Sequence, residues 1–343
     1  METTIHCNAN EAKTNIIRCI KANLVPFIQS SPGIGKSSIV KQIANEFRLK
    51  LIDHRLSTSA PEDLLGLPHF ENGKAVFSPF RDIFPLEDSL LPEGKDGWLV
   101  FFDEFNSAPR SVQAACYKII LDRQVGQYNL NKRCVIVCAG NKLDDNAITV
   151  NLSTAMQSRL VHIVMKEDFN VWLENVAFKQ NYDERVIGYL SMYPDQLMQF
   201  DPENTELTFP CPRTWEFVNR LIKNEPELND SWLALLSGTV NSGVAMSFLT
   251  YCKLRHEMLS INEILKDVDS APIPEKNETK WSTVFHLLSN LTEQNFDKIA
   301  KYIKRYPVDF KIIFYRAIKS KFPKLVNTPT FSSAMLDLAC YFE

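Results

Sequence analysis

The chain has 343 residues, of which 45% are hydrophobic and 23% charged, a composition that is typical of globular proteins and sufficient for about two or three domains. Its formal net charge of −3 excludes a global basic field, so only local basic patches are candidates for binding nucleic acid. Eight cysteines without a Cys-x-x-Cys pair and the absence of an apolar run of membrane length predict a cytoplasmic protein with reduced thiols and no membrane segment.

The first predicted elements are a helix over residues 11–24 and a strand over residues 26–29. The strand is followed by Ser30-Ser31-Pro32-Gly33-Ile34-Gly35-Lys36-Ser37-Ser38, and apolar residues then recur at helical spacing. A strand, a glycine-rich loop and a helix in this order predict a phosphate-binding loop. The alternative, a surface turn that merely contains Gly-Lys-Ser, does not explain the flanking strand and helix.

The residue types of this loop match the chemistry of phosphate binding. Gly33 and Gly35 let backbone N–H groups point inward, and the following helix aims its positive dipole end at the same place. We expect Lys36 to reach the β- and γ-phosphates of ATP and Ser37 to ligate Mg²⁺. Ser30 replaces the usual first glycine, which is a mild departure. The predicted nucleotide-binding residues are Ser31, Pro32, Gly33, Ile34, Gly35, Lys36, Ser37 and Ser38.

A second strand is predicted over residues 49–56, and Asn72-Gly73 between two short apolar stretches predicts a hairpin. Residues 98–102 are five consecutive apolar residues, as expected of a central strand covered on both faces, and Asp103 and Glu104 follow directly. We expect Asp103 to hold Mg²⁺, directly or through water, and Glu104 to be the general base that activates the attacking water. The alternative is a solvated acidic turn.

A helix, a second hairpin near Gly126 and a strand over residues 134–139 come next, and this strand ends at Gly140 and Asn141. Asn141 is a candidate contact for the γ-phosphate or the attacking water, although an Asn after a strand is usually a turn former. A short helix then carries Arg159 into a strand over residues 160–165. Strands that alternate with helices in this way predict an α/β fold with a doubly wound parallel sheet.

Beyond residue 166 the pattern is helical, with helices expected over residues 172–178, 184–192 and 214–222 and a long one over residues 232–254. We expect a nucleotide-binding core over residues 1–165, a helical lid over 166–266 and a C-terminal helical region over 267–343. The last region contains a basic stretch, which is either a docking face for an acidic partner or nucleic acid or, more commonly, a solvated helix face. Its members are Lys298, Lys301, Lys304, Arg305, Lys311, Arg316, Lys319, Lys321 and Lys324.

Several motifs together resemble those of MoxR-like AAA+ ATPases, in particular the short dynein-related type of phages and bacteria. They are Ser-Pro-Gly-Ile-Gly-Lys-Ser, Phe-Phe-Asp-Glu-Phe-Asn-Ser-Ala-Pro, Cys-Ala-Gly-Asn, Ser-Arg-Leu and Cys-Pro-Arg-Thr-Trp-Glu. The resemblance implies that Asn141 is sensor 1, Arg159 the arginine finger that reaches a neighbouring subunit's nucleotide, and Arg213 the sensor 2 arginine of the lid. Without it, Arg159 would be a cation at a helix end and Arg213 an ordinary surface residue.

The function that the resemblance implies is coupling of Mg²⁺-dependent ATP hydrolysis, in a hexameric homo-oligomeric ring, to remodelling or activation of a partner protein. A von Willebrand A domain protein is a candidate partner, and the two hairpins would line the pore of the ring. Many family members have an arginine where this chain has Ser107. Two alternatives stay open: a nucleic-acid motor or loader on the same ATPase core, and a nucleotide-gated scaffold that turns ATP over slowly.

Overall fold

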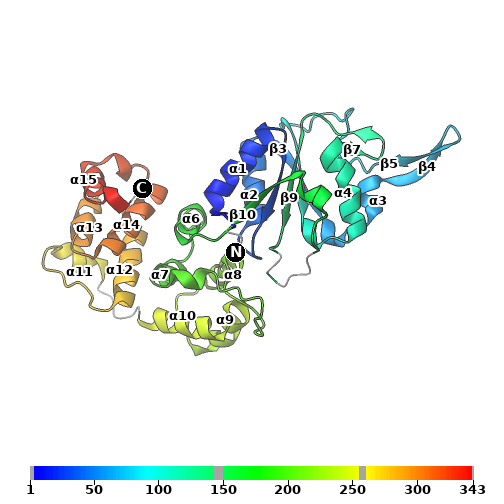
Figure 1. Ribbon diagram of the computed structural model, residues 1–343. Coiled ribbons are helices and arrows are strands. Elements are labelled where there is room, and N and C mark those ends of the chain that lie inside the picture. Colours follow the sequence, from blue (N-terminus) through cyan, green and yellow to red (C-terminus); the bar gives the residue numbers. More distant parts are fainter. Residues whose placement is uncertain (1–3, 143–144, 146–149, 255–259, 342–343) are drawn as a thin grey trace. The chain divides into compact units, whose positions relative to one another are not determined.

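The computed structural model describes residues 4–142, 145, 150–254 and 260–341 (Figure 1). The chain divides into two compact units, Met1–Asp168 with Asp201–Asn204, and Phe169–Phe200 with Thr205–Glu343. In the described part of the chain, no helix combines the length and the apolar character that crossing a bilayer would require.

A parallel sheet of six strands forms the first unit, in the order β1-β10-β2-β9-β6-β3. The strands are β1 (His6–Cys7), β2 (Val25–Gln29), β3 (Leu49–Arg55), β6 (Gly97–Asp103), β9 (Cys134–Gly140) and β10 (Leu160–Met165). Because neighbouring strands are parallel, their carboxyl ends meet at one edge of the sheet. The α/β fold predicted from the sequence, with a parallel sheet in the nucleotide-binding core, is confirmed.

Helices cover both faces of this sheet (Figure 1). On one face, α1 (Ala9–Lys21) and α2 (Lys36–Glu46) pack against a cluster that contains Leu99 and Phe101. On the other, α3 (Pro61–Leu65) and α4 (Arg110–Asp122) pack against a cluster that contains Val100 and Phe102. Successive residues of a strand point to opposite faces, so every residue of β6 is buried, and each fully buried Leu or Phe contributes roughly 1.5–3 kcal/mol.

Two antiparallel hairpins are inserted into the first unit. Strands β4 (Leu67–Glu71) and β5 (Lys74–Ser78) pair around Asn72 and Gly73, whose φ angles are +51° and +76°. Strands β7 (Gln124–Val125) and β8 (Tyr128–Asn129) pair around Gly126, with φ +59°. Both predicted hairpins are therefore confirmed, and Figure 1 shows β4 and β5 extending away from the sheet.

The second unit is helical. Its helices are α6 (Phe169–Trp172), α7 (Glu184–Met192), α8 (Pro212–Ile222), α9 (Leu233–Val240), α10 (Ser242–Leu254), α11 (Ile261–Lys266), α12 (Asn277–Ser289), α13 (Phe296–Ile303), α14 (Val308–Lys321) and α15 (Pro329–Asp337). The buried rings of Tyr189, Trp215 and Phe248 contact one another in tilted and edge-to-face arrangements, with centroids 5.4 to 5.7 Å apart. One hydrophobic cluster extends from Trp172 to Leu338, and the expected boundary between lid and C-terminal region stays a prediction.

The single long helix predicted over residues 232–254 is wrong. The structure has α9 and α10 instead, separated by Asn241, whose φ is +76°. The side-chain oxygen of Asn241 accepts a hydrogen bond from the Val244 N–H at 2.9 Å and so caps α10. Apolar residues keep a helical period on both sides of the break, which is why periodicity alone predicted one helix.

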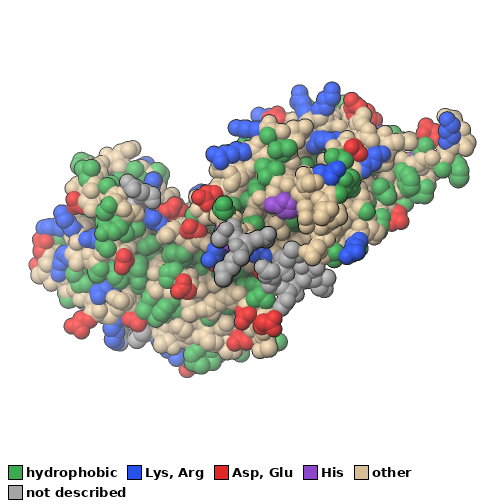
Figure 2. Space-filling view, viewed as in Figure 1, with side chains coloured by type: hydrophobic (Ala, Val, Ile, Leu, Met, Phe, Trp, Pro, Cys, Tyr) green, Lys and Arg blue, Asp and Glu red, His purple; other side chains and the backbone are tan. Residues whose placement is uncertain are grey.

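The basic stretch is largely engaged within the second unit. Lys301 Nζ lies 2.6 Å from an Asp269 oxygen, Lys304 Nζ 3.8 Å from an Asp337 oxygen, and Lys324 Nζ 3.3 Å from a Glu293 oxygen. Arg316 Nε lies 3.6 Å from a Glu174 oxygen. Figure 2 shows acidic and basic side chains interspersed over the face of this unit that it presents. These contacts support the alternative of a helix face with local pairing over that of a continuous docking face.

Arg305 has a structural role that the sequence did not suggest. One of its guanidinium nitrogens donates to the backbone carbonyls of Val268 and Ala271, each at 2.8 Å. The Tyr302 hydroxyl donates to the next carbonyl in this segment, that of Pro272, at 2.8 Å. Arg305 and Tyr302 therefore hold the segment that joins α11 to α12.

We expect Arg305→Gln to lower the free energy of unfolding by about 1–2 kcal/mol, because hydrogen bonds from a charged donor are lost. Thermal unfolding measures the change. Lys298→Gln on α13 is the matched control, since Lys298 is exposed and lies outside this clamp, and it should leave the melting temperature unchanged. Equal melting temperatures for the two variants would contradict the assigned role of Arg305.

Candidate functional site

The glycine-rich loop joins the carboxyl end of β2 to the first residue of α2. Its positive φ angles fall on Gly33, +81°, and Gly35, +105°, and not on Ser30. Ser30 is fully buried, and its N–H donates to the Gly140 carbonyl at 3.4 Å. A non-glycine residue is therefore tolerated at the start of the loop, and the departure from the usual pattern causes no backbone strain. The N-terminus of α2 opens into the loop, where unpaired N–H groups favour an anion.

Lys36, the first residue of α2, folds back over this loop. Its ammonium donates to the Ser30 carbonyl at 2.9 Å, to the Ser30 hydroxyl at 3.1 Å and to the side-chain oxygen of Asn141 at 3.1 Å. These three acceptors are neutral oxygens. A negatively charged phosphate oxygen in the place of one of them would add ionic attraction to the hydrogen bond, so the ammonium is placed to bind a phosphate.

Ser37 and Asp103 form a second polar pair at the same edge. The Ser37 hydroxyl donates to one carboxylate oxygen of Asp103 at 3.0 Å, and the Glu104 N–H donates to the other at 2.9 Å. A hydroxyl and a carboxylate are oxygen ligands of the kind that Mg²⁺ takes from a protein, with water and phosphate oxygens completing its octahedron. The residues present therefore fit the expected Mg²⁺ site. Burial, and then the negative charge of Asp103, raise the pKa of nearby Asp53.

Glu104 adopts an unusual backbone conformation and is held by the end of a neighbouring strand. Its φ and ψ are +55° and +35°, a left-handed conformation that costs a non-glycine residue about 1–3 kcal/mol. Its carboxylate accepts a hydrogen bond from the Ser57 hydroxyl, and its other oxygen lies 3.5 Å from Arg55 Nε. Sequence reasoning gave neither residue a role, although the pairing of Arg55 with Asp103 places them beside Glu104.

Asn141 follows β9 and has its backbone fixed by a second asparagine. The Asn141 N–H donates to the side-chain oxygen of Asn106 at 3.1 Å, and the side-chain nitrogen of Asn106 donates to the Asn141 carbonyl at 2.7 Å. Only 1% of Asn106 is exposed. Sequence reasoning missed Asn106 as well, although it lies in the same apolar-acidic motif as Asp103.

Arg159 lies at the amino-terminal end of the strands, opposite the end that carries the loop. It directly precedes β10, and β10 pairs with β2 so that Leu160 is opposite Val25 and Val164 is opposite Gln29. Arg159 is therefore level with Leu24, six residues before Ser30, so at about 3.3 Å per strand residue it lies roughly 20 Å from the start of the phosphate loop. Its guanidinium donates to the Ala155 carbonyl at the end of α5 (Thr154–Gln157) and lies 4.8 Å from the centre of the Tyr117 ring.

The structure thus brings together the loop, Asp103, Glu104 and Asn141, and does not bring Arg159 to them. Arg213 belongs to the other compact unit, where it is exposed in the first turn of α8. Its expected role as sensor 2 stays a prediction.

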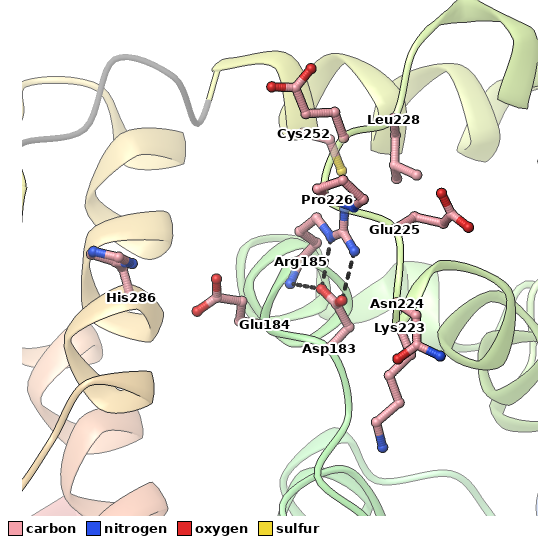
Figure 3. Close-up of a pocket in the computed structure, with 11 residues that line it drawn as sticks. Asp183, Glu184, Arg185, Lys223, Asn224, Glu225, Pro226, Leu228, Cys252 and His286 are labelled. Carbon is pink, nitrogen blue, oxygen red and sulfur yellow. Dashed lines mark hydrogen bonds and ion pairs between the residues drawn. The ribbon is translucent and has the colours of Figure 1, made fainter.

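The second unit contains a pocket of about 610 Å³ (Figure 3). At its centre the carboxylate of Asp183 pairs with the guanidinium of Arg185 at 2.7 Å, and both side chains are about nine-tenths buried. Arg185 also donates to the Ile222 carbonyl at the end of α8, and Asp183 caps the start of α7. Burial raises the pKa of Cys252, another lining residue, to about 12, so this thiol stays protonated. The Asp183–Arg185 pair therefore joins α7 to α8.

Comparison with known proteins bears on the first unit. Residues 27–160 match the family described as "AAA domain (dynein-related subfamily)". The match begins in β2 and ends at the start of β10, so it includes the loop, Asp103, Glu104, Asn141 and Arg159. No curated protein matches the chain by sequence.

Solved structures match this chain at low identity and low TM-score. A provisionally assigned ATPase from Cytophaga hutchinsonii is 14% identical, with a TM-score of 0.39 over 91% of this chain and 81% of that one. A mutant of RuvB from Thermotoga maritima is 14% identical, with a TM-score of 0.36 over 96% of this chain and 88% of that one. At such scores these structures add nothing to what the family match establishes.

We expect Glu104→Gln to retain ATP binding and to slow hydrolysis by roughly 10²- to 10⁴-fold, because the amide is nearly isosteric but cannot act as a base. Titration with a fluorescent ATP analogue measures binding, and phosphate release measures turnover. Glu62→Gln, an exposed carboxylate on α3, is the control and should behave as the unchanged protein. Turnover that is equal in the two variants would remove Glu104 from the mechanism.

Proposed function

We propose that this protein, an AAA+ ATPase whose residues 27–160 form an AAA domain of the dynein-related subfamily, couples Mg²⁺-dependent ATP hydrolysis to the remodelling of a partner protein. One observation carries the ATP-hydrolysing part of the proposal. The glycine-rich loop with Lys36, the Ser37–Asp103 pair and the Glu104 carboxylate lie together at the carboxyl ends of the strands of one parallel sheet.

The residues of this edge have complementary roles in the proposed reaction. Backbone N–H groups of the loop bind the phosphates, and Lys36 exchanges its neutral acceptors for phosphate oxygens. Ser37 and Asp103 would hold Mg²⁺, which neutralises phosphate charge when it is bound. Glu104 has to leave Ser57 and Arg55 before its carboxylate is free to take a proton from water.

We further infer that the protein works as a homo-oligomeric ring, hexameric as in the MoxR-like ATPases that it resembles. The position of Arg159 supports this inference, because an arginine about 20 Å from its own phosphate loop would be available to the nucleotide of a neighbouring subunit. The remodelled partner would be a protein, with a von Willebrand A domain protein as a candidate.

A second candidate function, a nucleic-acid motor on the same core, is favoured by one feature. The β4–β5 hairpin carries Phe70, which is 83% exposed, together with exposed Lys74, a combination that suits stacking on a base and contact with the backbone of a single strand. The intramolecular pairing of the basic stretch speaks against it.

Single-stranded DNA distinguishes the two candidates. For a remodeller of proteins we expect the ATPase rate at low salt to be unchanged by a 40-nucleotide strand. Stimulation that is severalfold, falls as salt is raised and is lost in Phe70→Ala would support the motor instead.

The arginine can be tested by mixing two inactive variants. Lys36→Ala removes the phosphate contact, and Arg159→Ala should bind ATP but lose roughly 10³- to 10⁵-fold in rate if Arg159 acts on a neighbour's γ-phosphate. An Arg159→Ala subunit whose neighbour is Lys36→Ala has an intact loop and receives an intact arginine. The mixture should therefore recover part of the ATPase activity, measured as phosphate release after the subunits have exchanged.

The control is a double variant, Lys36→Ala with Arg159→Ala, mixed with Lys36→Ala. No interface in that mixture has both parts, so it should stay inactive. If the first mixture also stays inactive although its subunits exchange, Arg159 acts within its own subunit or only supports the fold.

A further inference from the structure

Asn106 lies between the two parts of the nucleotide site that follow β6 and β9. It is two residues beyond Glu104, and its side chain is bonded to the backbone of Asn141 at 3.1 and 2.7 Å. Its own carbonyl accepts a hydrogen bond from the Val150 N–H at 2.6 Å. Through these contacts one buried residue joins the loop of the general base to the segment that begins with Asn141.

The side-chain amide of Asn106 supplies the hydrogen bonds that strand pairing between β6 and β9 does not give to Asn141. Strands β6 and β9 pair as far as Phe102 and Cys138, and the backbone groups of Asn141 lie beyond this ladder. Buried or half-buried backbone groups need partners, and the two on Asn141 are one donor and one acceptor. An Asn side chain supplies both an acceptor and a donor, whereas a carboxylate supplies acceptors alone.

Gly140 leaves the space that this contact needs. A Cβ atom at Gly140 would lie 2.1 Å from the side-chain oxygen of Asn106 and 3.0 Å from a ring carbon of Phe27. Any side chain at this position would therefore push the amide away from the Asn141 N–H. Gly140 and Asn106 form one close-packed unit.

We propose that Asn106 is a positioning residue for ATP hydrolysis, whose amide fixes Asn141 relative to the Glu104 loop. The inference rests on the proposed role of Asn141 at the γ-phosphate. Asn141 already points its side-chain oxygen at Lys36 Nζ, 3.1 Å away, and its backbone is anchored on both sides by Asn106. Loss of the anchor displaces the Asn141 side chain, and a displacement of about 1 Å near the reacting groups costs up to roughly 10²-fold in rate.

The first measurement separates positioning from folding. Asn106→Ala should lower kcat by roughly 10- to 100-fold and leave the dissociation constant of a fluorescent ADP analogue within threefold, because the loop and Lys36 are unchanged. Asn131→Ala is the matched control. Asn131 also bridges backbone segments with its amide, but it lies before β9, at the opposite edge. It should lower the melting temperature by a similar amount and leave kcat unchanged.

Two double-mutant cycles then test whether Asn106 acts through Asn141. In an Asn141→Ala background, Asn106→Ala should cause less than a twofold further loss of kcat, because the side chain that it positions is already absent. Gly140→Ala should lower kcat alone, and the change should be smaller in an Asn106→Ala background, where the overlapping amide has been removed.

Basal ATP hydrolysis by the full chain is sufficient for these measurements, so they do not depend on a partner protein or on remodelling. Kcat losses that multiply in the cycle of Asn106 and Asn141 would overturn the proposal, as would a loss for Asn131→Ala equal to that for Asn106→Ala. If Asn106→Ala fails to fold, Gly140→Ala supplies the same test with the amide retained, and an unchanged kcat in that variant would also overturn the proposal.

Discussion

The parallel ladder of β2, β9 and β6 is the constraint on which the nucleotide site depends. Parallel neighbours end at the same edge, so the phosphate loop, Asn141 and Asp103 meet without any contact between their sequence segments. The strands are fixed by burial on both faces, as the wholly buried β6 shows, and the apolar residues that bury them cannot also be polar ligands. The chemistry is therefore confined to the first residues after each strand, where the backbone is no longer paired. This is also where the side chain of Asn106 takes over the pairing of backbone groups.

The charged groups at this edge contact both neutral groups and, in the case of Glu104, an opposite charge. Lys36 is bonded to neutral oxygens, Asp103 to a hydroxyl and a backbone N–H, and Glu104 to Ser57 and Arg55. Burial and the charge of Asp103 together raise the pKa of Asp53, which shows how costly further negative charge is on the β3 and β6 side of the edge. A divalent cation beside Asp103 would relieve that cost, and a phosphate beside Lys36 would add an ionic attraction to its hydrogen bonds. The proposed ligand, ATP with Mg²⁺, would supply both the cation and the phosphate.

Much of the fold and of the candidate site could be predicted from the sequence, because the patterns that indicate them involve residues close together in the chain. The loop, the hairpin turn at Asn72 and Gly73 and the buried strand before Asp103 each depend on neighbouring residues. The contacts of Ser57, Arg55 and Asn106 depend instead on which strands are neighbours, and hydrophobic patterns give strand existence but not strand order. The same holds for Arg305, whose carbonyl partners lie more than 30 residues away. At Asn241 a local signal was present, since Asn tolerates positive φ, but an unbroken apolar period outweighed it.

The direction of the strands decides at which end of the sheet each site residue lies, which motif spacing alone does not. Asn141 is anchored by Asn106, and Glu104 contacts Arg55 and Ser57 at and just after the end of β3. Because Glu104 and Asn106 both lie in the loop after β6, a shift of that loop moves both catalytic candidates, Glu104 and Asn141, together. Arg159 precedes β10, and a residue before a strand lies at the opposite edge from a residue after a parallel neighbour. A rotation of side chains cannot cover roughly 20 Å, so it would not bring Arg159 to its own phosphate loop. The proposed contact of Arg159 with a γ-phosphate would therefore involve a second subunit, whereas the proposed roles of Lys36, Asp103, Glu104 and Asn141 lie within one.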